Sequence, residues 1–441
     1  MRKKIAFISE HASPLAVLGG VDSGGQNVYV AEICKHLSQL NYSIDIYTRK
    51  DSEDLPETLI WMPHIRVIHV KAGPAENVPK EFLLSHMPEF TDSMITYIRR
   101  NELEYELVHA NFFMSGWVAS QIKNQLNIPY VITFHALGKI RMIHQKESDA
   151  FPASRLEIEQ MIVHDADQII AECPQDEQDL IDYYRADPTR ITIIPCGFSS
   201  SEFYPSSRQS ARKRLNLAKD DIVLLQLGRI VPRKGIDNVI RAVGKLKDIS
   251  RTKLLVVGGA QEIPDFENDT EFKRLKQIAE SEGVLDKVIF TGRKDRNELK
   301  YYYQAADFFI STPWYEPFGI TPLEAMACGT PVIGSDVGGI KYSVKHQHTG
   351  FLVPPHNPEA LAAAVRKGIA DPVIYNNLRK NALKRVNEMF TWACVAKQTH
   401  KLYEQITCKS QKKPVYLLNN DFFKSQQMRG LRYNATTYLV Q

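Results

Sequence analysis

The sequence contains few cysteines, and their spacing argues against cross-linked or zinc-bound architectures. The six cysteines include no CxxC pair, so neither a zinc site built on such pairs nor a disulfide framework is indicated. They are Cys34, Cys173, Cys196, Cys328, Cys394 and Cys408. Free thiols in this number are typical of a reducing compartment, and we therefore expect a cytoplasmic protein.

Long hydrophobic runs are also missing. No apolar stretch approaches the roughly 20 residues that a membrane span requires. Arg2-Lys3-Lys4 precedes only the short run Ile5 to Ile8, which is too brief for the apolar part of a signal peptide and predicts a first strand instead. We therefore expect no transmembrane segment.

Neither sign of charge is in large excess. Lys and Arg number 55 and Asp and Glu number 51, which gives a net charge of +4 and does not indicate a nucleic-acid partner. Hydrophobic residues make up 44% and charged residues 24%, which is ordinary for a globular protein. At 441 residues the chain exceeds the size at which a single core stops growing, so two domains are expected. The composition indicates no particular oligomeric state.

Short apolar runs alternate with helical stretches in the first part of the chain. The runs are Ile5 to Ile8, Ser43 to Tyr47, Val67 to Val70, Leu107-Val108, Val131 to Phe134, Ile169-Ile170 and Ile191 to Ile194. Strands that alternate with helices imply a parallel sheet covered by helices on both faces. The sequence therefore predicts a doubly wound, Rossmann-like α/β domain over residues 1–200.

The same alternation returns after a change of composition. Ser-rich and then basic sequence, Ser199 to Arg214, is typical of a linker. Beyond it, strands are predicted over 222–227, 254–257, 288–290 and 308–310, and helices over 235–246, 271–281 and 297–305. We therefore expect a second Rossmann-like domain over residues 201–385, which faces the first across a cleft. Residues 386–408 are predicted to form a helix that crosses back to the first domain, and residues 409–441 are a tail without clear periodicity.

One stretch of the second domain carries the strongest functional signal. An apolar run, Phe308 to Ile310, leads into a loop punctuated by Pro and Gly, and a short helix is predicted to begin at Thr321, with Pro322 at its first position. Free backbone amides and the helix dipole at such an end form an anion site, and Gly319 lets the backbone approach the anion closely. Phosphate is the expected ligand.

Two carboxylates, Glu316 and Glu324, bracket this anion site. Their spacing suits binding of the hydroxyls of a sugar or ribose beside a phosphate. For Glu324 an alternative exists, because Thr321-Pro322-Leu323-Glu324 also fits a capping box in which the carboxylate folds back onto the backbone of Thr321. The sequence leaves both possibilities open for Glu324, whereas Glu316 has no comparable structural role.

Other polar residues also follow predicted strands, where ligands of doubly wound sheets bind. Arg229 and Lys234 lie in the loop Gly228 to Gly235 and could neutralise a pyrophosphate. The alternative is a solvated basic loop, which is the commoner role of a charge cluster. Gly24-Gly25 follows the first strand and His135 follows a later one, although a simple turn and a structural histidine are alternatives.

Two other patterns are set aside. Asp165-Ala166-Asp167 has the form of a metal-binding DxD motif, but it closes an amphipathic helix just before a strand, so we expect solvated or capping carboxylates and no metal ion. No GxGxxG follows the first strand, and this argues against a nicotinamide-dependent dehydrogenase.

Taken together, these motifs resemble family-four retaining glycosyltransferases of the two-Rossmann, GT-B type. The resemblance covers about residues 1–405 and rests on Gly24-Gly25, His135, the loop Gly228 to Gly235 and the pattern Glu-Pro-Phe-Gly-Ile-Thr-Pro-Leu-Glu of residues 316–324. It implies transfer of a hexose from a nucleoside diphosphate sugar, with UDP favoured, to a hydroxyl of a small acceptor. Retention at the anomeric carbon, no metal and no cofactor are further implications.

The resemblance also implies roles for individual residues. Arg229 and Lys234 would hold the diphosphate, Glu316 the donor sugar and its oxocarbenium-like charge, and His135 the sugar from the opposite domain. These four form the implied catalytic set. Glu324 would bind the ribose. The implied donor site comprises Gly25, Arg229, Lys234, Arg293, Phe318, Gly319, Ile320, Thr321 and Glu324.

On the acceptor side the sequence looks similar to enzymes that glycosylate inositol 3-phosphate, and also to sucrose-phosphate and sucrose synthases. In the inositol-phosphate enzymes, a Lys, a Tyr, a Thr and an Arg hold the acceptor phosphate. Lys80 and Arg155 match the charged pair, and Asn27 would contact an acceptor hydroxyl. Phe112 and Ala136 stand where the hydroxyl-bearing residues would be. The implied acceptor is therefore a polyhydroxylated small molecule, with or without a phosphate.

Two further classes compete with this interpretation. A sugar-nucleotide epimerase of the same architecture would bind the donor but would need no acceptor pocket. A non-catalytic nucleotide-sugar-binding protein or scaffold would lose part of the set Arg229, Lys234, Glu316 and Glu324. All four residues are present, which favours the enzyme.

Overall fold

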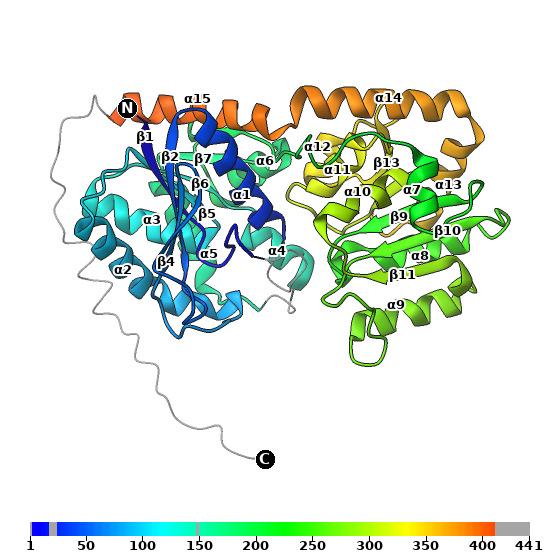
Figure 1. Cartoon of the computed structure of the whole chain (residues 1–441), viewed down its shortest axis with the longest axis horizontal. Helices are drawn as coiled ribbons and strands as arrows, with labels where there is room; N and C mark the ends of the chain where they lie inside the picture. The colour runs from blue at the N-terminus through cyan, green and yellow to red at the C-terminus, as the bar shows by residue number, and fades with distance from the viewer. Residues whose placement is uncertain (1, 17–23, 147–149, 411–441) are drawn as a thin grey trace, which may run out of the picture.

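A computed structural model describes residues 2–16, 24–146 and 150–410 of the chain. It consists of two α/β halves that lie side by side, each built around its own sheet (Figure 1). The predicted fold class is therefore confirmed. No helix within the described ranges is long and apolar enough to cross a membrane.

The sheet of the first half has eight strands. Seven are parallel, and β3 pairs antiparallel with β4 at one edge. In spatial order the strands are β3 (Thr58–Met62), β4 (Ile65–Val70), β2 (Tyr42–Arg49), β1 (Lys3–Ile8), β5 (Leu107–Asn111), β6 (Tyr130–Thr133), β7 (Gln168–Ala171) and β8 (Ile191–Ile193). Strand β3 was not predicted, although Leu59 to Met62 is an apolar run, and it lies at the exposed edge of the sheet.

Helices cover both faces of this sheet, so its central strands are buried on each side. One face packs under α1 (Gly25–Gln39), and the other under α2 (Met87–Arg100) and α3 (Phe113–Leu126). The remaining helices of this half are η1 (Lys80–His86), α4 (Gly138–Gln145), α5 (Ser154–Asp165), α6 (Pro174–Tyr184) and η3 (Pro188–Arg190). Burial on both faces explains the continuous apolar runs in strands such as β1, β6 and β7.

The sheet of the second half is wholly parallel. Its spatial order is β11 (Val288–Gly292), β10 (Thr252–Val257), β9 (Ile222–Leu227), β12 (Phe308–Ser311), β13 (Val332–Ser335) and β14 (Gly350–Val353). The helices are α7 (Arg208–Arg214), η4 (Pro232–Lys234), α8 (Ile236–Gly244), α9 (Thr270–Ser281), η5 (Leu285–Lys287), α10 (Arg296–Ala305), α11 (Ile320–Ala327), α12 (Gly338–Ser343), α13 (Pro358–Ala370) and α14 (Pro372–Met389).

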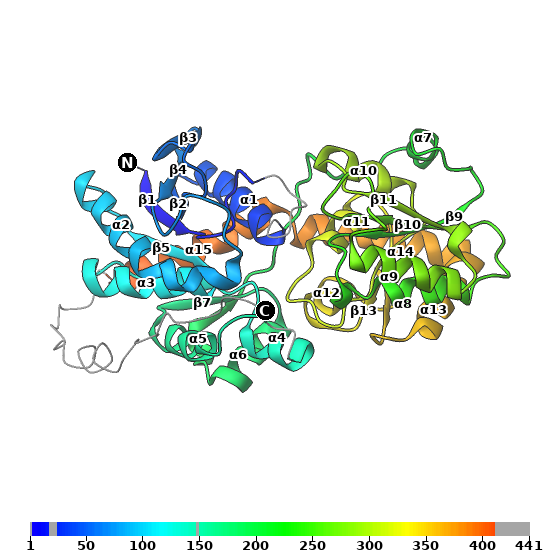
Figure 2. The same ribbon diagram turned by 90° about the horizontal axis from the view of Figure 1, so that it is seen from below.

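The last described helix, α15 (Trp392–Ser410), returns to the first half, as expected (Figures 1 and 2). Trp392 packs edge-on against Tyr29 of α1, with ring centroids 5.7 Å apart. Further along the helix, the Tyr403 hydroxyl lies 2.6 Å from Nδ1 of the buried His109. These contacts attach the end of the described chain to the first sheet.

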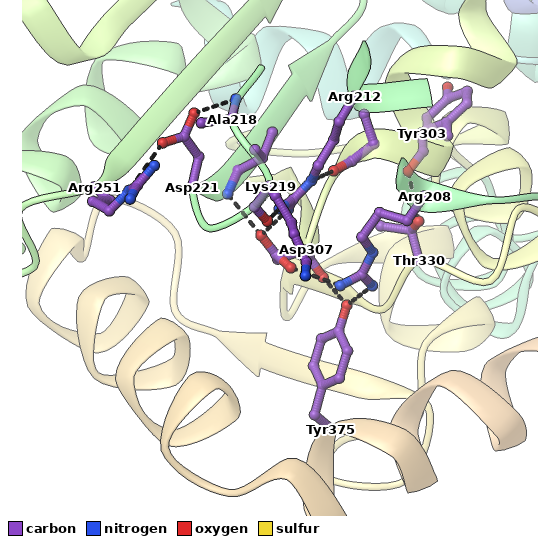
Figure 3. A network of polar contacts seen from close by, with 12 residues as sticks. Arg208, Arg212, Ala218, Lys219, Asp221, Arg251, Tyr303, Asp307, Thr330 and Tyr375 are labelled. Carbon is purple, nitrogen blue, oxygen red and sulfur yellow. Dashed lines mark hydrogen bonds and ion pairs between the residues drawn. The ribbon is translucent and has the colours of Figure 1, made fainter. Parts of the chain in front are cut away.

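The basic segment between the halves is anchored rather than solvated (Figure 3). Arg208 and Arg212 of α7 each donate to a different oxygen of Asp307, in both cases at 2.8 Å. The backbone N–H of Val223 donates to the same carboxylate at 2.7 Å, and Arg208 also contacts the hydroxyl of Tyr375. The linker helix is thereby fixed to the second half.

Candidate active site between the two sheets

Loops from both sheets meet where the halves face each other. Chain order reverses between β1 and β5 in the first sheet and between β9 and β12 in the second, and ligands of doubly wound sheets bind at such reversals. The loops after β1, β6, β9 and β12 lead to Gly25, His135, Lys234 and Glu316. The halves are close at this place, because a Cβ added to Gly25 would lie 3.8 Å from Cδ1 of Ile320.

A cavity of about 280 Å³ lies between the halves. Its first-half wall is formed by α4, α6 and the residues beside them, among them Leu137 and Asp176. Its second-half wall consists of residues 314–317 and 336–338, which include Glu316. The cavity can therefore place a small molecule in contact with Glu316 and with both halves.

The predicted anion site is the N-terminus of α11. Gly319 is the N-cap residue, with φ of 90°, so the helix begins at Ile320, one residue earlier than predicted. A Cβ on Gly319 would lie 3.2 Å from Cγ of Glu316, so the glycine leaves room for that side chain. The amides of the first turn, including that of Thr321, have no partner within the helix itself.

Lys234 and Glu316 meet directly in front of this helix end. The Lys234 ammonium donates a hydrogen bond to Oε2 of Glu316. Both side chains are largely buried, with 18% and 11% exposed. Arg229 and Arg233 are close enough for their charges to act on both groups. Lys234 therefore contacts the carboxylate that precedes α11, and the charges of two arginines from the same loop act on it.

This clustering changes both ionisation equilibria. Burial lowers the pKa of Lys234 to about 8, and the charges of Arg233 and Arg229 add to that effect against the opposing pull of Glu316. Burial alone would raise the pKa of Glu316, but the charges of Lys234 and Arg233 outweigh it and hold that pKa below its usual value. The positive charge in excess over Glu316 favours an anionic ligand.

Glu324 lies on the same helix but faces inward, with 3% of its side chain exposed. Its carboxylate accepts hydrogen bonds from Arg296 at 3.1 Å and from the Tyr303 hydroxyl at 2.8 Å. It does not fold back onto Thr321, so the capping-box alternative is wrong. A ribose-binding role for Glu324 stays a prediction, in which Arg296 and Tyr303 would orient the carboxylate.

His135 follows β6 in a left-handed backbone conformation, with φ of 58°. Its Nδ1 lies 2.9 Å from Oε1 of Glu172, and its Nε2 lies 3.1 Å from Oδ1 of Asn111. The ring is 10% exposed, and Tyr29 packs edge-on against it. His135 therefore sits in a defined polar setting at the strand end where it was expected.

The predicted acceptor residues are engaged with neighbouring groups of the first half. Asn27 donates to the carbonyl of Ser13 at 2.9 Å and accepts from the N–H of Gly24 at 2.9 Å. Lys80 forms an ion pair with Glu81 at 3.5 Å. Their contact with an acceptor stays a prediction, and the bonds of Asn27 show it holding the loop before α1.

Arg155 and Phe112 form a cluster that was not anticipated. Arg155 is 2% exposed, donates to Glu159 at 2.7 Å and to the carbonyl of Ala136 at 2.6 Å. Its guanidinium centre lies 4.9 Å from the ring centroid of Phe112, and two further rings, Phe113 and Phe151, lie as close. The carboxylate of Glu159 and three aromatic rings thus surround Arg155, the residue that was predicted to hold an acceptor phosphate.

The remaining donor residues lie at the expected strand and loop positions. Arg293 follows β11, and its N–H donates to the carbonyl of Gln261 at 2.7 Å. The Phe318 ring is buried in the core near Phe390, with centroids 6.2 Å apart. Only the backbone of Phe318 can therefore face a ligand in this conformation, and the role of both residues stays a prediction.

Several polar residues of the site were missed. Glu172 directly follows the buried strand β7, so the same strand-end rule would have singled it out. Arg233 stands beside Lys234 in the loop already identified. Arg296 gave no signal, because its contact with Glu324 bridges 28 residues and depends on how two helices pack.

Comparison with known proteins agrees with this geometry. Residues 23–202 match the family model described as Glycosyltransferase Family 4, and residues 207–385 match the model described as Glycosyl transferases group 1. A D-inositol 3-phosphate glycosyltransferase from Streptomyces bingchenggensis is 34% identical over 411 residues, which cover 91% of this chain and 89% of that protein. The chain belongs to glycosyltransferase family 4. It is therefore a glycosyltransferase.

Solved structures give the same assignment. Sucrose-phosphate synthase from Thermosynechococcus elongatus superposes with a TM-score of 0.84 at 36% identity, covering 92% of this chain and 100% of that one. An Anabaena protein, HepE, in complex with UDP and glucose superposes with a TM-score of 0.73 at 20% identity, covering 92% of this chain and 100% of that one. At that identity, the second match supports the glycosyltransferase GT-B fold alone.

Proposed function

We propose that this glycosyltransferase moves a hexose, with retention, from a UDP-sugar to a hydroxyl of a small polyhydroxylated acceptor. The observation that carries the proposal is the contact of Lys234 with Glu316 before the N-terminus of α11, where the charges of Arg229 and Arg233 also act. Cations in a loop beside the free amides of a helix N-terminus suit a diphosphate. A carboxylate among them suits the sugar attached to that diphosphate.

Donor binding would rearrange the contact between Lys234 and Glu316. A diphosphate carries more negative charge than the single carboxylate, so it would draw the Lys234 ammonium away from Glu316. The freed carboxylate could then accept hydrogen bonds from the hydroxyls of the sugar in the adjoining cavity. The donor itself would thus prepare Glu316 for the reaction.

In the proposed reaction, the bond between the anomeric carbon and the diphosphate oxygen breaks, and a bond to the acceptor oxygen forms on the same face of the sugar. The leaving diphosphate takes the proton of the acceptor hydroxyl, so no proton is left over. Arg229, Lys234 and the amides of α11 stabilise the charge that develops on the diphosphate, while Glu316 stabilises the positive charge on the sugar. These groups are preorganised, and the proposal therefore includes no metal ion.

The relatives guide the choice of substrates. The Anabaena fold relative was solved with UDP and glucose, which favours UDP-glucose as the first donor to test. The relatives named above act on D-inositol 3-phosphate or form sucrose phosphate by name. A sucrose-type transfer to a ketose is therefore the second candidate, and the superposition at 36% identity favours it specifically.

The test is a matrix of donors and acceptors. UDP-glucose, UDP-N-acetylglucosamine, GDP-mannose and ADP-glucose are each incubated alone and with inositol, inositol 3-phosphate, fructose and fructose 6-phosphate. Free diphosphate is followed over time, and NMR of the product gives its anomeric configuration. We expect acceptor-dependent release of UDP and a product that keeps the α configuration of the donor.

Three outcomes would contradict the proposal. An inverted product would rule out retention. Epimerised donor in the absence of any acceptor would favour an epimerase of the same architecture. Donor binding without turnover across the whole matrix would indicate a nucleotide-sugar-binding protein instead.

A further inference from the structure

The surroundings of His135 determine how many protons its ring carries. Both ring nitrogens have a hydrogen-bond partner within the first half, Glu172 on one side and Asn111 on the other. A neutral imidazole has one N–H and one acceptor nitrogen, whereas an imidazolium has two N–H donors. The charge of the ring therefore depends on whether each partner accepts or donates.

Asn111 acts as an acceptor toward His135. Its Nδ2 lies 3.3 Å from the carbonyl of Ile8 and 3.3 Å from the carbonyl of His109. Only the amide NH2 can donate to two carbonyls, so the side chain is fixed with Oδ1 toward His135. The Nε2 of His135, 3.1 Å from that oxygen, must then carry a proton.

Glu172 acts as an acceptor on the other side. Its Oε1 lies 2.9 Å from Nδ1 of His135 and also accepts from the thiol of Cys196 at 3.1 Å. The side chain is 3% exposed. The Cys196 thiol gives Glu172 a hydrogen bond but no positive charge to balance the buried carboxylate. His135 is the adjoining group that can supply that positive charge.

The other titratable groups around the ring support this arrangement. Burial, and then the charge of Glu172, raises the pKa of Asp176 on α6 to about 8. Burial, and then the same charge, raises the pKa of Cys196. Burial, and then a positive charge on His135, lowers the pKa of His109 on β5 to about 3. Asp176, Cys196 and His109 are therefore largely uncharged near neutral pH.

The remaining neighbours of the ring come from α1. Tyr29 packs edge-on against His135 with centroids 4.8 Å apart, and burial raises the pKa of its hydroxyl well above the usual value. It carries no charge near neutral pH. Glu172 is thus the carboxylate that directly pairs with the ring.

We infer that Glu172 is a positioning residue that, with Asn111, keeps His135 as a doubly protonated cation at the carboxyl end of β6 in the first sheet. The inference rests on the proposed function for its catalytic meaning. Gln26 donates to the backbone carbonyl of Asn111 at 3.3 Å, so the ring is connected to the start of α1, where Gly25 faces Ile320 of α11. His135 thereby adds a fixed positive charge from the first half to the site that binds the donor sugar.

The inference predicts opposite shifts for two variants. Glu172→Gln keeps the shape and removes the carboxylate charge, so His135 should lose its second proton at a pH lower by about one unit. Asn111→Asp adds a carboxylate at Nε2, so the loss should occur at a pH higher by a similar amount. Histidine side-chain ¹H–¹⁵N spectra of the free protein, with His135→Gln used to assign the signal, measure this directly.

The same variants are then compared in activity. As pH rises, kcat/KM should begin to fall at a lower pH in Glu172→Gln than in wild type, and at a higher pH in Asn111→Asp. Asp45→Asn is the matched control. Asp45 is a buried carboxylate that pairs with Arg66 at 2.6 Å, and it lies on β2 of the same sheet, whereas His135 follows β6. It should destabilise the protein without moving either pH profile.

Two results would overturn the inference. One is a neutral His135 ring in the wild-type spectrum below pH 7, and the other is a Glu172→Gln spectrum with the same pH dependence as wild type. The spectra need no substrate, so they separate a failure of this inference from a failure of the proposed function. Thermal melting of each variant confirms that the compared proteins are folded.

Discussion

At the scale of single residues, the site depends on a small number of charges held in place before any ligand binds. Lys234 is the clearest case, because burial and two neighbouring arginines lower its pKa to about 8 while Glu316 keeps it in position. A lysine with this pKa is still mostly charged at neutral pH. Its ammonium can leave the carboxylate and bind a ligand that carries more negative charge.

Lys234→Ala should lower turnover by about 100-fold, because it removes one contact that stabilises the developing charge on the leaving diphosphate. Steady-state kinetics with the active donor and acceptor measure the effect. Lys245→Ala is the control, since Lys245 is a half-exposed lysine of the same half that pairs with Glu359, and it should behave as wild type. Turnover of Lys234→Ala within a few-fold of wild type would show that the ammonium is not at the diphosphate.

At the scale of elements, the N-terminus of α11 organises the second half of the site. Gly319 adopts φ of 90° and gives Glu316 the space beside it. The helix start was predicted to within one residue, because Pro322 is a strong local signal. The partners of Glu324 were not predictable, because they come from α10 and follow from packing between helices rather than from local sequence.

Gly319→Ala should reduce both stability and activity. A side chain at this φ costs about 1 to 2 kcal/mol, and the added Cβ would press on Glu316 and misplace its carboxylate. Thermal melting and kcat/KM report the two effects. Gly283→Ala is the control, because Gly283 has φ of 62° and an added Cβ would meet only the flexible end of Lys247, at 3.4 Å. It should lose stability but keep activity, and equal loss of activity in both variants would contradict the role given to Gly319.

A second prediction at this scale concerns the anchor of α7 (Figure 3). Asp307→Ala leaves Arg208 and Arg212 without their shared carboxylate, and loss of one partner from such a buried pair costs about 3 to 5 kcal/mol. Urea unfolding measures the change. Asp248→Ala removes an exposed ion pair with Arg366 and should change stability little. Equal stabilities for the two variants would show that the network around Asp307 does not anchor α7.

At the scale of the whole molecule, the alternation of strands and helices predicted two doubly wound halves and the return of the last helix. What the sequence did not reveal were contacts between distant segments. Glu172 and His135 lie 37 residues apart, and two of the rings that enclose Arg155, those of Phe112 and Phe113, come from the start of α3. No local pattern marks either arrangement. The edge strand β3 was also missed, although its apolar residues Leu59 to Met62 are visible in the sequence.

Closure of the two halves around the donor is the expected large-scale motion, because the predicted ligands of donor and acceptor lie on opposite halves. Contacts already connect them, including His144 stacked on Tyr315 with centroids 4.9 Å apart. Small-angle scattering should show a smaller radius of gyration when UDP is added. The Lys234→Ala variant should respond less at the same UDP concentration, and unchanged dimensions of the wild type at saturating UDP would argue against closure.

The central claim is that the diphosphate lies between the loop after β9 and the N-terminus of α11. Calorimetric titration of UDP, with the chelator EDTA present throughout, tests it most directly in wild type, Arg229→Ala, Lys234→Ala and Lys245→Ala. Charge-assisted hydrogen bonds contribute about 1.5 to 3 kcal/mol each, so the first two variants should bind UDP about 10-fold to 100-fold more weakly, and Lys245→Ala should match wild type. Equal affinities in all four proteins, or no binding by wild type under EDTA, would contradict the account.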